Sequence, residues 1–226
     1  MATKFGRIFQ KQLRHHVILR RKIERELIKC SRQLRRLKRK SQLDTHIILL
    51  VDFLLEINQA VTECFKLGYV SSGLHELRLA QEISHKLLAI QLKPQLVGKK
   101  KVSAREVRDV LKEQGLADWK GAYNRLSMVS HHYKQFLEEW YPSMRINASI
   151  AESDIEFLKY WLTVLNILNM KALAVLLTQL KPHVGAGDDT LFSRWSKLDR
   201  AVQADWRASD ELLKAIRLNH SFEGNT

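Results

Sequence analysis

Residues 155–180 read IEFLKYWLTVLNILNMKALAVLLTQL, and this is the most apolar stretch of the chain. The charged and amide side chains that interrupt it include Glu156, Lys159, Asn166, Asn169 and Lys171. Because of these interruptions, no continuous apolar segment of membrane-spanning length remains. We therefore expect this stretch to form the central core helix of the fold, and we expect no transmembrane segment.

The few prolines and glycines of the chain stand where helices should end, and strand patterns are absent. Gly68 and Pro94 each follow a segment with helical periodicity, and Ser103 with Glu106 matches a capping box at a helix start. Besides the core helix, the predicted helices after the N-terminal region cover residues 47–67, 74–92, 103–114, 119–140 and 190–218. An all-α helical bundle with a long basic N-terminal helix is the simplest architecture for this pattern.

The positive charge of the chain is concentrated at its N-terminus. Of a formal net charge of +14, residues 1–43 hold +13, with fifteen Lys and Arg against Glu24 and Glu26. The other 183 residues are almost balanced, with 23 basic and 22 acidic side chains. No predicted loop is long enough to force a domain boundary. We therefore expect a basic helical arm over residues 1–43, a helical bundle over 44–220 and a disordered tail over 221–226.

The basic arm also carries an apolar stripe with helical spacing, interrupted where His16 and Arg20 occupy the same stripe. Its members are Phe9, Leu13, Ile23, Leu27, Cys30, Leu34 and Leu37. If the stripe packs on another helix, the basic residues occupy the remaining faces and present a rod of cations to a phosphate backbone. The candidate nucleic-acid contacts are Arg20, Arg21, Lys22, Arg25, Lys29, Arg32, Arg35, Arg36, Lys38, Arg39 and Lys40, together with Lys99, Lys100 and Lys101 from a loop.

A charge distribution this one-sided favours a polyanionic partner. Nucleic acid, with RNA favoured, is the first hypothesis, and an anionic membrane surface is the lesser one. A solvated basic face in a coiled coil, without any ligand, is the third alternative. No apolar segment of a secretory signal follows the early charges, and Cys30 and Cys64 lack metal-binding spacing. We expect a cytoplasmic protein that needs no cofactor and no metal.

One segment combines side chains that RNA cleavage can use. Residues 123–132 read YNRLSMVSHH and lie within the predicted helix 119–140. Arg125 and His132 are seven residues apart and share a helix face, while His131 points about a third of a turn away. A histidine that titrates near neutral pH and a fixed cation are what metal-free cleavage of RNA requires. Arg125, His131 and His132 are therefore the candidate catalytic residues.

An Arg followed by a His on a helix of a small all-α bundle resembles the signature of the HEPN superfamily. The resemblance covers roughly residues 47–141, and the segment LRLAQE at residues 77–82 is similar to a segment of some HEPN-like bacterial families. The superfamily includes dimeric, metal-independent ribonucleases that act as toxins and in antiviral defence. The resemblance implies a homo-oligomer or a complex with a partner protein, and a role in bacterial or phage defence.

Two functions from different classes follow from these observations. In the first, which we prefer, the chain is a nucleic-acid-binding HEPN-like protein whose arm holds RNA and whose bundle docks on a partner. In the second, it is a metal-independent endoribonuclease that uses Arg125 and either His131 or His132. Whether the protein is an enzyme is left open at this point.

Overall fold

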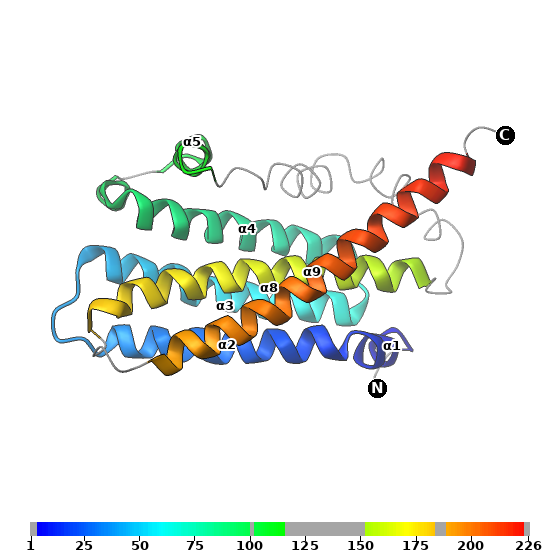
Figure 1. Cartoon of the computed structure of the whole chain (residues 1–226), viewed down its shortest axis with the longest axis horizontal. Coiled ribbons are helices and arrows are strands. Elements are labelled where there is room, and N and C mark those ends of the chain that lie inside the picture. Colours follow the sequence, from blue (N-terminus) through cyan, green and yellow to red (C-terminus); the bar gives the residue numbers. More distant parts are fainter. Residues whose placement is uncertain (1–3, 100–101, 116–151, 184–188, 224–226) are drawn as a thin grey trace.

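The computed structural model describes residues 4–99, 102–115, 152–183 and 189–223, and every regular element within them is a helix. The α-helices are α1 (Lys4–Gln12), α2 (Arg14–Arg35), α3 (Gln42–Leu67), α4 (Val70–Leu92), α5 (Ala104–Glu113), α8 (Glu152–Leu180) and α9 (Asp189–Glu223), and the short 3₁₀ helices are η1 (Pro94–Gly98) and η4 (Lys181–His183). The predicted all-α bundle is confirmed (Figure 1).

Helix α8 runs through the middle of the bundle, as predicted for residues 155–180. It contacts α2, α4 and α9, and α4 and α2 lie on opposite sides of it (Figure 1). Every residue from Tyr160 to Met170 is buried. By length and composition alone, Leu158–His183 is apolar enough to cross a membrane, but 83% of its most apolar window is buried inside the bundle. Burial of this extent is what the core helix of a bundle shows.

Helices α3 and α4 form a close antiparallel hairpin. Gly68 ends α3 in the left-handed conformation, with φ of 85°, and the Tyr69 amide donates to the carbonyl of Cys64 at 2.8 Å. Gly73 lies directly against the ring of the buried Phe65, where a β-carbon would overlap the ring. The absence of a side chain at Gly73 is therefore what allows the two helices to approach so closely.

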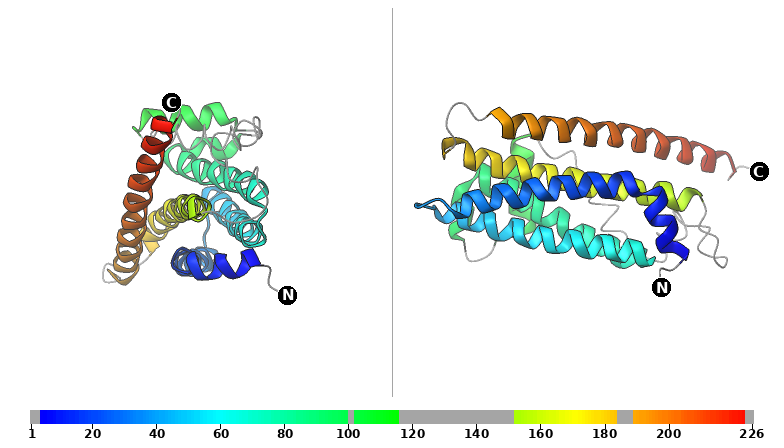
Figure 2. Two further views of the ribbon diagram at one scale, coloured as in Figure 1. Left: turned by 90° about the vertical axis from the view of Figure 1, so that its right-hand side faces the viewer. Right: turned by 90° about the horizontal axis from the view of Figure 1, so that it is seen from below.

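The basic N-terminal region consists of two helices, because the chain departs from helical geometry at Leu13 (φ −104°, ψ 7°). Short α1 lies at an angle to α2, and α2 then runs between α9 and α3 when the molecule is seen from below (Figure 2, right). The predicted apolar stripe of α2 faces inward, with Ile23, Leu27, Cys30 and Leu34 fully buried. The helices of residues 4–35 therefore pack in the same bundle as the helices that follow them.

At the other end of the chain, α9 continues to Glu223. Helical structure therefore extends into the segment 221–226, for which the sequence predicts disorder. Residues 224–226 lie outside the described residues.

Candidate nucleic-acid interface

The solvent side of α2 carries a stripe of cations and no exposed carboxylate. The exposed cations along the helix are Arg14, Arg21, Lys22, Arg25, Lys29, Arg32 and Arg35. The two acids of α2, Glu24 and Glu26, point toward its flanks, and their side chains are only 19% and 16% exposed. With a rise of about 1.5 Å per residue, the stripe is roughly 30 Å long.

The structure corrects the assignment of Arg20 to the ligand-binding set, because this side chain is buried against α3 and only 6% exposed. Its Nη1 donates to the carbonyl oxygen of Asn58 at 2.8 Å and to the hydroxyl of Thr62, while Nε lies 3.5 Å from the Glu24 carboxylate. Burial lowers the pKa of Arg20 and raises the pKa of Glu24. Arg20 therefore joins α2 to α3 and is not accessible to a ligand.

A few of the predicted contact residues have partners within the protein. Lys29 Nζ lies 2.8 Å from the Glu26 carboxylate, Arg35 pairs with Asp52 on α3, and Lys40 donates to the carbonyl oxygen of Arg35 at 2.8 Å. The others have no carboxylate partner among the residues that the structure describes, namely Arg21, Lys22, Arg25, Arg32, Arg36, Lys38 and Arg39. Half of the fourteen predicted residues, these seven, are therefore solvated, uncompensated charge.

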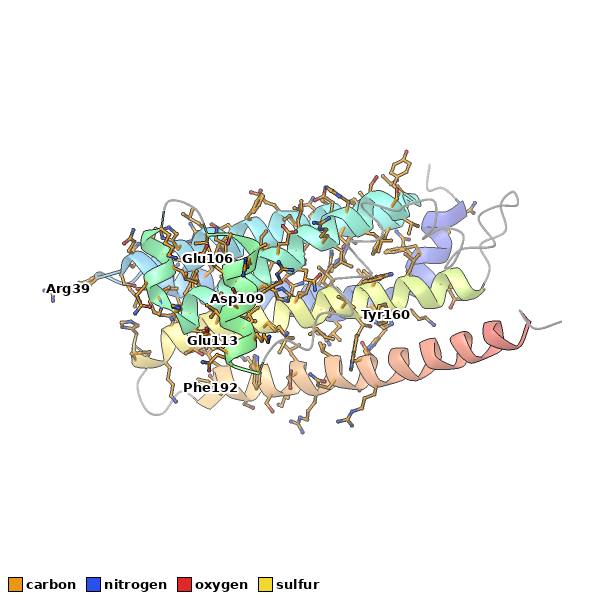
Figure 3. The ribbon with its side chains drawn as sticks, turned by 90° about the horizontal axis from the view of Figure 1, so that it is seen from above. Arg39, Glu106, Asp109, Glu113, Tyr160 and Phe192 are labelled. Carbon is orange, nitrogen blue, oxygen red and sulfur yellow. The ribbon has the colours of Figure 1, made fainter. Side chains whose placement is uncertain are left out.

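The connection from α2 to α3 carries the cations around one end of the bundle. Arg36, Lys38, Arg39 and Lys40 are all exposed in this connection. Figure 3 shows Arg39 projecting beyond the last turn of the neighbouring helices. The stripe of α2 and this loop therefore form one continuous basic surface, which we call the α2 face.

Helix α9 lies beside α2 and is joined to it at two points. His15 Nε2 lies 3.1 Å from Asp205 Oδ1, and Arg194 Nη1 lies 3.9 Å from Glu26 Oε2. His15 and Glu26 are 11 residues apart on α2, as are Arg194 and Asp205 on α9. The two helices therefore run antiparallel over this length, for roughly 16 Å.

The part of α9 next to α2 adds cations that the sequence analysis missed. Between residues 190 and 208, every exposed charged side chain is basic, and these are Arg194, Lys197, Arg200 and Arg207. The acids in this range, Asp199 and Asp205, are partly buried. A net charge count conceals the pattern because six bases and six acids balance over residues 189–223 as a whole. The signal that was present is the spacing of the cations at three, three and seven residues, which places them on one side of a helix.

Asp205 is held between the two histidines of α2. Its Oδ2 lies 3.3 Å from His16 Nδ1, in addition to the contact with His15, and His16 Nδ1 also lies 3.4 Å from the hydroxyl of Thr163 on α8. Burial raises the pKa of the Asp205 carboxyl, but hydrogen bonds and charge from His16 and His15 outweigh burial and leave the pKa below its ordinary value. This carboxylate therefore fixes α9 to α2, and its side chain is only 16% exposed.

Of the predicted loop lysines, Lys99 does not extend the α2 face. Lys99 pairs with Glu106 at the start of α5, and hydrogen bonds from Lys99 and Ser103 hold the pKa of Glu106 at about 2. Helix α5 lies on the opposite side of the bundle from α2 (Figure 1), and its acids Glu106, Asp109 and Glu113 are labelled in Figure 3. Lys100 and Lys101 lie outside the described residues.

The candidate catalytic residues Arg125, His131 and His132 also lie outside the described residues. In the other segment of the HEPN resemblance, Arg78 Nε donates to the Glu82 carboxylate at 3.2 Å, as in an ordinary ion pair on a helix face. Within the described ranges, no three His, Cys, Asp or Glu side chains gather into a group that could hold a metal ion.

Comparison of the chain with protein-family models, with curated proteins and with solved structures found no match. The HEPN resemblance therefore stays a prediction from the sequence. The described residues define the molecule by its architecture and charge, as an all-α bundle with a basic face built on α2.

Proposed function

We propose that this protein binds nucleic acid, with RNA favoured, through the α2 face. The observation that carries the proposal is the absence of any exposed carboxylate on α2, a helix with seven exposed cations. Five of these seven, all except Lys29 and Arg35, have no carboxylate partner among the residues that the structure describes. A polyanion supplies the counter-charge that the protein does not supply itself.

The binding would be driven by the phosphate backbone. Cations that neutralise phosphates release condensed counterions, so the affinity falls steeply as salt is added. Arginine and lysine contacts to phosphates carry little sequence information. The α2 face presents these two residue types in a row about 30 Å long, and it is rigid because α2 is anchored on its inner side. Salt-sensitive, sequence-independent binding is therefore the expected behaviour.

A membrane surface is the weaker alternative for a specific reason. A helix that lies in a bilayer interface must present its apolar side to the lipid. The apolar stripe of α2 is instead buried in the bundle, and Ile18, 40% exposed, is the one large apolar side chain classed as exposed within Arg14–Arg35. The α2 face therefore has the charge to bind an anionic surface, but Ile18 is the one exposed large apolar side chain that α2 could insert into lipid.

The test is a charge reversal on α2 with a matched control. The variant Arg21→Glu/Arg25→Glu/Arg32→Glu should bind labelled RNA at least about tenfold more weakly, and the slope of log affinity against log salt should fall by roughly 2 to 3. The control Lys93→Glu/Arg108→Glu/Lys112→Glu makes the same change in net charge at exposed positions on α5 and at the end of α4. Equal losses in the two variants, or tighter binding to anionic vesicles than to RNA, would contradict the proposal.

The same assay examines the cleavage hypothesis. Arg125, His131 and His132 lie outside the described residues, and cleavage is tested separately from binding. Incubation of the labelled RNA with the protein in EDTA, with Arg125→Ala alongside, measures cleavage independently of affinity. Cleavage by the parent chain that is lost in Arg125→Ala would add a ribonuclease activity to the binding function.

A further inference from the structure

We infer that the ligand is double-stranded and that it is gripped by two helices, with the exposed cations of α9 binding alongside the α2 face. This inference rests on the proposed function and specifies its substrate class. It starts from the juxtaposition of α2 and α9, which the sequence does not reveal. The proposed class of ligand is a nucleic-acid duplex. The experiment below tests an RNA duplex and a DNA duplex separately.

The basic surface that α2 and α9 form together is wider than a single helix. The contacts between His15 and Asp205 and between Arg194 and Glu26 hold α2 and α9 side by side. Neighbouring helices have axes about 8 to 10 Å apart, so a surface formed by both is wider than one phosphate strand needs. On the outer sides of both helices, the exposed charged side chains that the structure describes are all basic. A broad surface of one charge sign matches a ligand that carries two phosphate strands.

Aromatic side chains are scarce among the described residues of this surface. Proteins that bind single strands without sequence preference stack successive bases on aromatic side chains. The tryptophans of α9 in the described range, Trp195 and Trp206, pack against the core, and Trp206 lies 5.6 Å from the ring of Tyr160 on α8. The exposed rings are His15, which pairs with Asp205, and Phe192 at the start of α9. Within the described side chains of α2 and α9, no row of stacking platforms therefore accompanies the cations.

Helices α2 and α9 hold their cations rigidly. Both helices are anchored to α8, so the cations are held on a stiff frame. A duplex is itself stiff over this length and loses little conformational entropy on such a surface, whereas a flexible strand must be ordered. Each phosphate contact also releases about 0.9 counterions from a duplex but about 0.7 from a single strand. The gain in counterion entropy therefore also favours the duplex.

The experiment compares probes of about 20 base pairs with single strands of the same length. The probes are an RNA duplex, a DNA duplex, oligo(U) and oligo(dT), and affinity is measured by fluorescence anisotropy over a salt series. The proteins are the parent chain, the α9 variant Lys197→Glu/Arg200→Glu/Arg207→Glu, and the control Lys93→Glu/Arg108→Glu/Lys112→Glu. A second α9 variant with Gln at the same three positions guards against misfolding caused by the acidic side chains.

We expect the parent to bind at least one duplex roughly tenfold more tightly than either single strand, and both α9 variants to lose duplex affinity well beyond the control, with a smaller salt slope. Oligo(U) or oligo(dT) bound as tightly as the duplexes would overturn the inference. So would α9 variants that behave like the control. If the α2 reversal weakens binding while the α9 variants do not, this inference fails and the proposed function survives. If the α2 reversal also has no effect, the proposed function itself fails.

Discussion

Arg20 and Arg21 are adjacent in the chain and have opposite surroundings. Arg20 is buried and bonds to Asn58 and Thr62 on α3, while Arg21 is exposed on the α2 face. A one-residue step along a helix rotates the side chain by about 100°, which is enough to carry it from the core to solvent. Arg20 therefore contributes to the stability of the fold, whereas Arg21 is available to bind a ligand.

We predict that Arg20→Ala lowers the free energy of unfolding by roughly 3 kcal/mol, because it leaves Glu24 and the polar groups of Asn58 and Thr62 without their buried partner. Arg21→Ala should change stability by no more than about 0.5 kcal/mol but weaken RNA binding. Urea unfolding and RNA titration of the two variants measure both quantities. Equal stability of the two variants would show that the buried contacts of Arg20 contribute little.

The sequence contains a signal for the burial of Arg20. Arg20 and His16 lie on the apolar stripe of α2, and a position on that stripe predicts burial. Counting charges instead placed Arg20 among the ligand contacts. What the sequence could not supply was the partner, since Asn58 and Thr62 are 38 and 42 residues away.

At the scale of the helices, local signals located most ends. Gly68 ends α3, the capping box of Ser103 and Glu106 starts α5, and Leu180 closes α8 just before Pro182, as the sequence predicts. These are short-range effects of glycine, capping side chains and proline, so the sequence contains them directly. The position of α9 beside α2 depends on contacts between residues about 170 to 190 apart, such as Arg194 with Glu26, and no local pattern reports it.

The α3–α4 hairpin provides a prediction at this scale. Gly73→Ala gains up to about 1 kcal/mol of helix propensity, but its β-carbon would overlap the buried Phe65 ring, and overpacking costs typically 1 to 3 kcal/mol, so a net loss of roughly 1 kcal/mol is expected. Chemical denaturation measures the loss. Gly98→Ala is the matched control because no atom lies within 4 Å of its added carbon. A Gly73→Ala protein at least as stable as the parent would mean that Phe65 moves aside easily.

At the scale of the whole molecule, the charge is polarised across the bundle. The α2 face lies on one side, while α5, on the opposite side, exposes acids as well as bases (Figures 1 and 3). Like charges along α2 repel one another while no ligand is bound, and this repulsion opposes folding. The row of positive charges on α2, which favours a polyanionic ligand, therefore reduces the stability of the free protein.

We predict that the free protein becomes more stable as salt is raised from about 0.05 to 0.3 M, with the melting temperature rising by roughly 2 to 4 °C, because salt screens this repulsion. The Arg21→Glu/Arg25→Glu/Arg32→Glu variant should melt higher than the parent at low salt and respond less to added salt. Differential scanning fluorimetry without nucleic acid measures both effects. A melting temperature that falls with salt would show that attractive surface ion pairs dominate instead.

The contact between α2 and α8 joins the first third of the chain to its last third. During synthesis at about 5 to 20 residues per second, the apolar stripe of α2 therefore emerges several seconds or more before α8 exists to cover it. Throughout that interval the nascent chain is amphipathic, with an open apolar side and a dense basic side. Helix α2 is thus synthesised well before the helix that buries its apolar stripe, so the fold depends on the ribosome completing α8 before this surface finds another partner.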